Sequence, residues 1–529
     1  MKRNAMKKTA AAAVFLVCAA MTAYYLIAGY GAYLDADMAS ELSLAQHLAQ
    51  EGTLISPTWR YSTEVRVLST QLVFAPLMAL FPNQWRLVRT LGDLILLGMM
   101  AASTYFCARS LGARRRYALV FSGLSISACS LVYSQMILIG AYYVPHAILT
   151  NLCVGLTARA VSAARGKAAY IAGLLTLCAL MGASSIRYLF CAAMPVAAAG
   201  IWMFLFPGGQ REELPRTKED RRRVVVACAA ALVSLAGFAV GQRILGKHFL
   251  SAAARYGGSR LTAFTADDLP ALAQDALGGL ARLMGYREHS ILISLHGLVS
   301  VGALLLPVLA TILAVRALRK DDDVRFGALT LLMSAALTAG TFLLVEGLYI
   351  NRYWIPLMTL GAPVMAACLS REQNLPLRRV SALFFVGMVL LSSAMQIKES
   401  MASPEIGQAQ KERTAYLEEN GLDFGYATFW NANVTTELTD GRTEVVAITL
   451  HKNEEGQAVP EFGSWLEAEE NLKMNRPDEP VFLLLSAEEA DTLHDFLADC
   501  GAEKEAEHGS LGVWRVKTQR AFFGAMEPV

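Results

Sequence analysis

The sequence predicts a mainly α-helical, polytopic bundle of transmembrane helices followed by a smaller α/β domain. Three observations support this fold class. Hydrophobic residues make up 54% of the 529 residues and charged residues only 17%, a composition too apolar for an ordinary soluble protein. Over residues 1–397, apolar runs of membrane-spanning length alternate with short basic clusters. Residues 398–529 have the mixed polarity of a soluble domain, so we expect a domain boundary near residue 397.

Eleven segments are predicted to cross the membrane, because each has about 18 or more residues that are mainly apolar. They lie near residues 10–29, 88–108, 117–134, 142–158, 168–183, 188–206, 224–244, 291–315, 326–345, 353–369 and 380–397. The first segment follows a basic start, as in a signal peptide. It continues through "YYLIAGYGAYL", which is long for a signal peptide, so we expect a retained helix.

Basic residues predict the orientation of these segments, since Lys and Arg concentrate in cytoplasmic loops. The connections after the second, fourth, sixth, eighth and tenth spans are all basic: "RSLGARRR", "ARGK", "RTKEDRRR", "RALRKDDDVR" and "REQNLPLRR". The start of the chain, "MKRNAMKK", is basic as well. With eleven spans, this pattern predicts a cytoplasmic amino terminus and an extracytoplasmic C-terminal domain.

The first outer connection, residues 30–87, is predicted to hold two more helices. Met38–Glu51 has helical periodicity, with its apolar residues on one face: Leu42, Ala45, Leu48 and Ala49. Residues 68–82, "LSTQLVFAPLMALFP", are too few for a span and suit a re-entrant or interfacial element.

The last 132 residues predict alternating helices and strands. "PEIGQAQKERTAYLEENGL" is typical of a polar helix, and "FGYATFW" and "TEVVAITL" of strands that flank a turn or short helix, "NANVTTELTDG". "PVFLLLS" and "LGVWRV" predict two more strands around an amphipathic helix that ends at Gly501. This domain has no nucleophile elbow, phosphate loop or metal motif, and its single cysteine, Cys500, excludes an internal disulfide framework.

Charged residues gather on the predicted outer side, where such residues often mark functional sites. They are Asp35, Asp37, Glu41, Glu64, Arg66, Arg86, Arg89, Asp93, Arg187, Glu346 and Arg352. Arginine binds phosphate through a planar fork and stays charged when partly desolvated. A nearby carboxylate could take a proton from a hydroxyl group or hold a divalent cation. We therefore expect an outward cavity for a phosphate-bearing substrate.

The spacing in the first outer loop resembles that of the GT-C-type membrane glycosyltransferases. That family includes the protein O-mannosyltransferases and the bacterial aminoarabinose and lipopolysaccharide-core transferases. Its pattern is an Asp just after the first span, an Ala eight residues later and a Gly about fifteen later, which Asp37, Ala45 and Gly52 match. The resemblance thus selects Asp37 as the catalytic carboxylate, with Asp35 as the second candidate. Met38 stands where the family usually has an acidic residue.

Two further stretches resemble the same family. Downstream of Gly52, Tyr61 precedes an acidic and a basic residue, and "NRYWIPLMTLGAP" has the family's Arg-Tyr and following Pro at the outer start of a late span. "SSIRYLFCAAMP" has a similar form earlier in the chain. The substrate-binding candidates are Glu64, Arg66, Arg187, Tyr188, Arg352 and Tyr353.

The resemblance implies hexosyl or pentosyl transfer at the outer face of a plasma membrane. The donor would be a sugar on a polyprenyl phosphate and the acceptor a hydroxyl group on a glycan, lipid or protein, with no nucleic acid involved. Asp37 would act as the base on that hydroxyl or as a cation ligand, with inversion at the sugar. Arg66, Arg187 and Arg352 would hold the donor phosphate. No cofactor is implied apart from a divalent cation, which stays open.

Each candidate also has a simpler interpretation. The two aspartates could be a solvated helix exit in which Asp37 or Ser40 caps the next helix. Arg187 and Arg352 could extend to lipid headgroups. His146 is more typical of a packed, hydrogen-bonded side chain than of a catalytic one, and "NVT" at Asn433 fits a glycosylation acceptor.

Two other functions compete with the transferase hypothesis. A transporter or flippase of lipid-linked glycan would also have many spans and outward arginines, but paired repeats and broken mid-membrane helices are not evident. A catalytically inactive envelope scaffold is the third hypothesis, because Met38 replaces the usual acidic residue.

Overall fold

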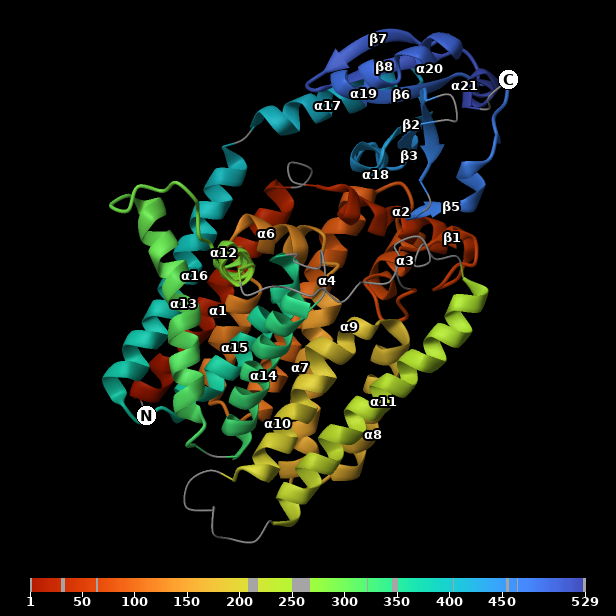
Figure 1. Ribbon diagram of the computed structural model, residues 1–529. Coiled ribbons are helices and arrows are strands. Elements are labelled where there is room, and N and C mark those ends of the chain that lie inside the picture. The colour runs from red at the N-terminus through yellow and green to blue at the C-terminus, as the bar shows by residue number, and fades with distance from the viewer. Residues whose placement is uncertain are drawn as a thin grey trace.

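The computed structural model of the chain describes residues 2–29, 34–62, 65–207, 217–249, 267–320, 322–344, 351–402, 404–452, 456–463 and 465–526. Within these ranges, ten helices are long and apolar enough to cross a membrane, and they form one bundle (Figure 1). They are α1 (Lys2–Ala28), α4 (Trp85–Ser110), α7 (Val144–Ser162), α8 (Lys167–Ser184), α9 (Ile186–Tyr188) continued by η2 (Leu189–Ala193) and α10 (Met194–Leu205), α11 (Lys218–His248), α13 (Leu295–Ala317), α14 (Asp322–Leu344), η5 (Asn351–Trp354) continued by α15 (Ile355–Arg371), and α16 (Leu375–Met401). The chain is therefore a multi-pass membrane protein.

The expected span at residues 117–134 is not one continuous helix. It consists of α5 (Arg115–Ser125), α6 (Leu131–Tyr133) and the π-helical η1 (Ser134–Ile139). Serine side chains in "SISACS" compete for backbone groups that a continuous helix would use. The Ser130 hydroxyl accepts a hydrogen bond from the Tyr133 N–H at 3.1 Å, so α6 starts anew at this point.

The broken segment still connects the two ends of the bundle. The Arg114 N–H, just before α5, donates to the Ser370 hydroxyl at the end of α15. Tyr142, which follows η1, contacts Arg352 at the opposite end of the η5–α15 segment. The chain thus passes between α4 and α7 in two pieces, and ten of the eleven expected spans are helices of spanning length within the described residues.

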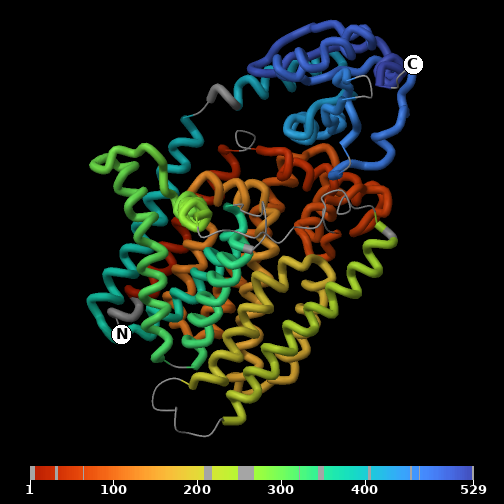
Figure 2. The backbone as a smooth tube through the Cα atoms, viewed as in Figure 1, coloured from red at the N-terminus to blue at the C-terminus, as the bar shows by residue number. Residues whose placement is uncertain are grey.

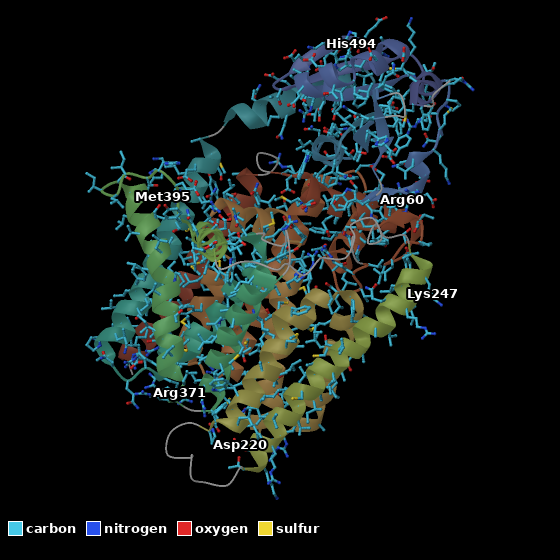
Figure 3. All side chains as sticks on the ribbon, viewed as in Figure 1. Arg60, Asp220, Lys247, Arg371, Met395 and His494 are labelled. Atoms are coloured by element: carbon cyan, nitrogen blue, oxygen red, sulfur yellow. The ribbon has the colours of Figure 1, made fainter. Side chains whose placement is uncertain are left out.

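The two ends of the bundle differ in what they carry. Asp220 and Arg371, from two connections that the sequence predicts to be cytoplasmic, lie at the lower end in Figure 3, and His494 of the C-terminal region lies at the upper end. Figure 2 follows the chain from the bundle through α17 (Pro404–Glu419) into this upper region.

The first connection covers the upper end of the bundle and contains the predicted helices. α2 (Ala36–Glu51) begins after Asp35 and ends at Gly52, whose left-handed backbone has φ 66°. The predicted apolar face is buried, with Leu42 and Ala45 fully inaccessible. The short strand β1 (Trp59–Arg60) and the ten-residue helix α3 (Gln71–Leu80) follow. α3 is too short to span, as the sequence predicts.

The C-terminal region is built on a six-stranded mixed sheet in the order β4-β3-β2-β6-β8-β7. The strands are β2 (Phe424–Thr428), β3 (Glu444–Lys452), β4 (Ala458–Phe462), β6 (Val481–Ser486), β7 (Glu503–His508) and β8 (Leu511–Val516). β2 runs parallel to β3 and β6 in the centre, and the other pairs are antiparallel. This sheet confirms the α/β class predicted for the end of the chain.

Several C-terminal boundaries differ from the prediction. "FGYATFW" is a strand only to Thr428, because α18 (Phe429–Leu438) begins there and includes the segment expected to be a turn or short helix. The expected helix ending at Gly501 is two helices, α19 (Ala487–Thr492) and α20 (His494–Asp499). The edge strand β7 was not predicted, since "EKEAEH" lacks apolar alternation. α21 (Gln519–Met526) closes the domain.

The C-terminal region contacts the first connection directly. The two-residue strand β5 (Glu467–Ala468) pairs with β1, Trp59 opposite Ala468, and is followed by the turn η6 (Glu469–Leu472). The Ser43 hydroxyl on α2 donates to Asn433 Oδ1 on α18 at 2.7 Å. α2 therefore lies between the bundle and the sheet.

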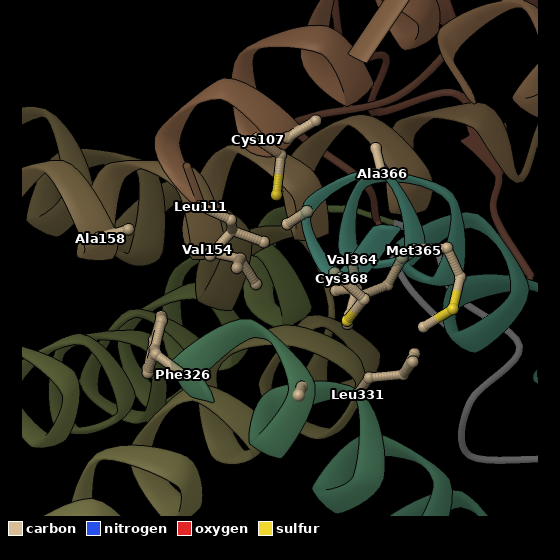
Figure 4. Close-up of a cluster of buried hydrophobic side chains, with 14 of the residues drawn as sticks. Cys107, Leu111, Val154, Ala158, Phe326, Leu331, Val364, Met365, Ala366 and Cys368 are labelled. Atoms are coloured by element: carbon tan, nitrogen blue, oxygen red, sulfur yellow. The ribbon is translucent and has the colours of Figure 1, made fainter. Parts of the chain in front are cut away.

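Below α2, the bundle has a close-packed apolar core. Figure 4 shows side chains from α4, α7, α14 and α15 meeting there, among them Cys107, Val154, Phe326 and Val364. α7 and α15 both begin at the end of the bundle that α2 covers. The core thus fixes the position of the residues at their amino-terminal ends.

Candidate active site

A cavity of about 500 Å³ lies where α2, the first connection, the bundle and the C-terminal region meet. It gathers residues from six separate parts of the sequence. Its lining includes Asp35, Asp37, Ser40, Glu41, Leu44, Leu48, Leu54, Tyr61, Ser62, Arg66, Ser69, Gln71, Tyr142, Tyr143, Arg187, Arg352, Phe429, Trp430, Trp465 and Leu466. Five of the eight candidate site residues, including both aspartates and all three arginines, line this cavity.

Asp37 and Arg352 form an ion pair inside the cavity. Arg352 Nη1 lies 3.1 Å from Asp37 Oδ2 and also donates to the Tyr142 hydroxyl at 3.1 Å. Asp37 stands in the first turn of α2 and Arg352 in η5. Their side chains are 27% and 31% exposed, so a ligand in the cavity can reach both groups.

Asp35 has a different role in the fold. Its carboxylate caps α2 by accepting the Met38 N–H at 2.9 Å. Burial raises the pKa of Asp35 above the usual carboxyl value, and this hydrogen bond opposes the increase. The simpler interpretation named Asp37 or Ser40 as the cap, which is wrong, because the capping side chain is that of Asp35.

Of the other substrate-binding candidates, some line the cavity and others do not. Arg66 and Arg187 line the cavity, and the Arg187 guanidinium lies 5.6 Å from the centre of the Tyr353 ring. Tyr188 points into the core instead. Its ring stacks on His146 at 4.6 Å and its hydroxyl donates to the Leu68 carbonyl.

Two acidic residues of the outer-side set, Glu64 and Glu346, lie outside the described residues. His146, the minor candidate, is buried between the rings of Tyr143 and Tyr188 and does not line the cavity. It is packed as expected, but the hydrogen bond expected for it is not found, since neither ring nitrogen has a partner in the described structure.

Three buried polar atoms of the cavity lining have no hydrogen-bond partner in the described structure: Gln71 Oε1, the Tyr143 hydroxyl and Arg352 Nε. A buried polar atom without a partner costs about 1–3 kcal/mol. The Tyr143 hydroxyl and Arg352 Nε can donate a hydrogen bond, and Gln71 Oε1 can accept one. A ligand with an anionic group would accept from the two donors, and its hydroxyl groups could donate to Gln71.

The C-terminal region supplies one wall that sequence reasoning missed. Phe429 and Trp430 begin α18, and Trp465 precedes β5. The available signal was the aromatic residues themselves, the Phe429–Trp430 pair and Trp465. The sequence alone does not show what these residues contact, because only the fold brings them to the cavity that contains Asp37.

A buried ion pair attaches this wall to the bundle. Arg89 on α4 contacts both carboxylate oxygens of Glu437 on α18, at 2.9 and 2.7 Å, and the two side chains are 1% and 0% exposed. Arg89 also donates to the Met38 carbonyl at 2.7 Å, next to Asp37. Asn433, on the same helix α18, is only 3% exposed and accepts a hydrogen bond from Ser43, so the folded chain does not offer it as a glycosylation acceptor.

A second, apolar cavity of about 430 Å³ lies within the bundle. Its lining includes Trp354, which lies two residues after Arg352 and whose indole N–H donates to the Ala276 carbonyl of α12 (Leu269–Leu283). Its other lining residues come from α5, α6 and α12–α16, including Leu277, Leu306, Ala336, Leu357, Ala362 and Phe385. Nearly all of them are apolar, as a hydrocarbon chain would require.

The described residues do not fit a bound divalent cation. No group of three or more His, Cys, Asp or Glu side chains among them could hold a metal ion. Moreover, one oxygen of Asp37 faces a guanidinium and one oxygen of Asp35 caps a helix. We therefore derive no step through a metal.

The chain has no match among protein-family models and none among curated proteins. Solved structures do match. ArnT from Cupriavidus metallidurans bound to undecaprenyl phosphate has a TM-score of 0.59 at 12% identity, with 98% of this chain and 99% of that chain covered. ArnT in the apo state has a TM-score of 0.56 at 12% identity, with the same shares covered. The Archaeoglobus fulgidus oligosaccharyltransferase has a TM-score of 0.48 at 11% identity, with 90% and 69% covered.

The ArnT structures establish the fold of this chain over nearly its full length. They confirm the helical bundle with a C-terminal α/β domain, and with it the GT-C-like architecture that the spacing around Asp37 suggested.

Proposed function

We propose that the chain is a membrane glycosyltransferase that moves a hexose or pentose from a polyprenyl-phosphate donor to a hydroxyl group of a glycan, lipid or protein. The observation that carries this proposal is the Asp37–Arg352 ion pair in a cavity that Arg66 and Arg187 also line. A carboxylate beside several guanidinium groups suits a reaction that removes a proton at one point and releases a phosphate at another.

The donor phosphate binds at Arg66, Arg187 and Arg352. The buried Arg352 Nε and Tyr143 hydroxyl, which lack partners in the described structure, are further donors for its oxygens. The prenyl chain occupies the apolar cavity whose lining includes Trp354, two residues after Arg352. ArnT, which has the same fold, was crystallised with undecaprenyl phosphate, and this supports a polyprenyl donor.

Asp37 is the base in this proposal, and Arg352 controls its availability. When the donor phosphate enters, it competes with Asp37 for the Arg352 guanidinium. Asp37 then accepts the proton of the acceptor hydroxyl, whose oxygen attacks the anomeric carbon with inversion. The bond from that carbon to the phosphate oxygen breaks, and polyprenyl phosphate leaves with the bonding electron pair, its charge balanced by the arginines.

The proposed location is a plasma membrane with the cytoplasmic amino terminus and residues 398–529 outside. The separation of Asp220 and Arg371 from the C-terminal region in Figure 3 supports this orientation, because their connections are basic. Residues 1–397 are then the transferase domain, and the outer domain covers the acceptor side of the cavity.

The test is a transfer assay with the purified full chain in lipid vesicles. Undecaprenyl phosphate carrying a radiolabelled hexose or pentose is the donor, and glycan, lipid and peptide pools are the acceptors. We expect labelled acceptor and released undecaprenyl phosphate. Movement of intact donor across the vesicle membrane without cleavage would contradict the proposal and support a flippase, and neither cleavage nor movement would support a scaffold.

A further inference from the structure

Three aromatic side chains of the C-terminal region form one patch on the wall of the cavity. The rings of Phe429 and Trp430 are 5.5 Å apart, edge to face, and Phe429 stacks on Trp465 at 5.4 Å with an interplanar angle of 30°. All three residues line the cavity that contains Asp37. The patch therefore lines the same cavity as the carboxylate that we propose as the base.

Trp430 is the exposed member of this patch. Its relative accessibility is 70%, whereas Phe429 and Trp465 are half-buried and hold each other in place. Exposed apolar side chains that gather in one patch, rather than singly, often mark a surface on which a ligand packs. The Trp430 indole packs edge to face on Phe429 and leaves most of its surface exposed at the cavity.

Polar groups also line this cavity. Glu41 on α2 accepts hydrogen bonds from the side chains of Thr70 and Gln71. The Gln71 amide group is thereby held with its Oε1 buried and without a partner in the described structure. The cavity thus combines a flat aromatic surface with an unused acceptor and a proposed base.

This combination fits a sugar ring better than a peptide or a lipid chain. A pyranose has an apolar face of C–H groups that packs on an aromatic ring, and hydroxyl groups around its edge for Gln71 and Asp37. An extended peptide that binds by strand addition would need an unpaired strand edge. The described strand at this wall, β5, is already paired with β1, and the Leu466 N–H donates to the Arg60 carbonyl.

A lipid chain would need a longer apolar surface than three rings. The cavity that offers such a surface includes Trp354 in its lining and lies within the bundle among α12–α16, and it is assigned to the donor. The patch belongs to α18 and the loop before β5, on the side of α2 away from the bundle core.

We propose that Trp430, supported by Phe429 and Trp465, is an acceptor subsite, and that the acceptor is a saccharide whose six-membered ring stacks on Trp430. This inference rests on the proposed function and deepens it, because it selects the glycan from the three acceptor classes. One hydroxyl group of the stacked ring then faces Asp37.

The test is saturation-transfer-difference NMR on the full chain in lipid nanodiscs. The probes are methyl β-D-glucopyranoside, methyl β-D-galactopyranoside and methyl α-D-mannopyranoside, which present different C–H faces. Irradiation of the aromatic protons of the protein should transfer saturation to one ring face of at least one probe. Trp430→Ala should weaken this binding about tenfold, the effect of losing one aromatic stacking contact, whereas Trp430→Phe should retain most of it.

Trp202→Ala is the matched control. Trp202 is also exposed, at 44%, but lies on α10 in the bundle, so its loss should leave probe binding unchanged. Equal signals from wild type and Trp430→Ala, or no signal from wild type with any of the three glycosides, would overturn the inference.

The inference and the proposed function fail in different ways. If the wild type cleaves the undecaprenyl-phosphate donor but Trp430 does not affect glycoside binding, the saccharide subsite is wrong and the transferase stands. If glycosides bind through Trp430 and the donor is never cleaved, the transferase is wrong and the saccharide site stands.

Discussion

Arg352 holds Asp37 by an ion pair of 3.1 Å, although the two residues are 315 positions apart in the sequence. Asp37 opens the helix that lies between the bundle and the sheet, and Arg352 opens the span that borders the apolar cavity. The pair therefore joins the proposed acceptor side of the cavity to the proposed donor side. It is the contact on which the proposed reaction depends.

Removing the charge of Arg352 should weaken donor binding. Hydrogen bonds to charged groups contribute about 1.5–3 kcal/mol, so Arg352→Gln should raise the donor KM roughly 10- to 100-fold. Arg352→Lys should lie between wild type and Gln, because it keeps the charge and loses the planar fork. Steady-state kinetics with varied donor measure this. Arg86→Gln, an exposed arginine outside the cavity, is the control, and an unchanged donor KM in Arg352→Gln would contradict the assignment.

Filling the apolar cavity should hinder the donor without affecting acceptor binding. Ala362 lines this cavity, and Ala362→Phe places a ring where the prenyl chain would lie. We expect the donor KM to rise about tenfold, in keeping with the 1–3 kcal/mol that overfilling of a packed site costs. Val308→Phe, at a 53% exposed position of α13, controls for a new aromatic ring in the bundle. Equal effects of both variants would refute the prenyl assignment.

The Arg89–Glu437 pair should be essential for stability. Removing one partner of a buried ion pair leaves the other charge uncompensated and typically costs about 3–5 kcal/mol. Glu437→Gln should therefore lower the thermal unfolding temperature of the purified protein clearly. The comparison variant is Asp478→Asn, which breaks a pair whose side chains are 64% and 82% exposed and should change the unfolding temperature little. Similar unfolding temperatures for the two variants would show that the Arg89–Glu437 pair contributes little to holding α18 on the bundle.

Stability should fall as the pH rises above about 4.5. Burial raises the pKa of Glu467 to about 7 from its usual 4.5, although hydrogen bonds from Asn471 and from the backbone N–H groups of Ala447 and Ala468 oppose the shift. A carboxyl group with a raised pKa in the folded state stabilises the fold below its unfolded pKa, and this stabilisation is lost as the pH rises through the folded value.

Unfolding temperatures measured from pH 4.5 to 8 should thus decrease in the wild type and decrease less in Glu467→Gln. Burial also raises the pKa of Glu444 in the same region, so part of the slope should remain. Glu461→Gln, at an exposed position on β4 of the six-stranded sheet, should keep the wild-type slope. A wild-type slope in Glu467→Gln would exclude this residue as a source of the pH dependence.

The membrane part of the fold was largely predictable from the sequence. Long apolar runs and basic connections depend on local composition, and α2 on local periodicity, so each can be recognised within about twenty residues. The break at Ser130 was missed because a side chain that caps a new helix looks, in hydropathy alone, like one polar residue in a span.

The site was predictable in its bundle half and not in its C-terminal half. Spacing to Ala45 and Gly52 led us to propose Asp37 rather than Asp35 as the base, and the two residues differ in the structure, since Asp35 caps α2 and Asp37 pairs with Arg352. Pairings such as Arg89–Glu437 and Ser43–Asn433 join residues 348 and 390 positions apart. No local pattern encodes such contacts, so the aromatic wall around Trp430 emerged only from the fold.

The most direct test of the account is the rate of sugar transfer by Asp37→Asn beside Asp35→Asn, both in the vesicle assay with a labelled undecaprenyl-phosphate donor. General-base catalysis contributes about 10²- to 10⁴-fold, so Asp37→Asn should lose that much rate. Asp35→Asn should stay within about threefold of wild type, because Asn caps a helix as well as Asp does. Transfer by Asp37→Asn at the wild-type rate would contradict the central claim.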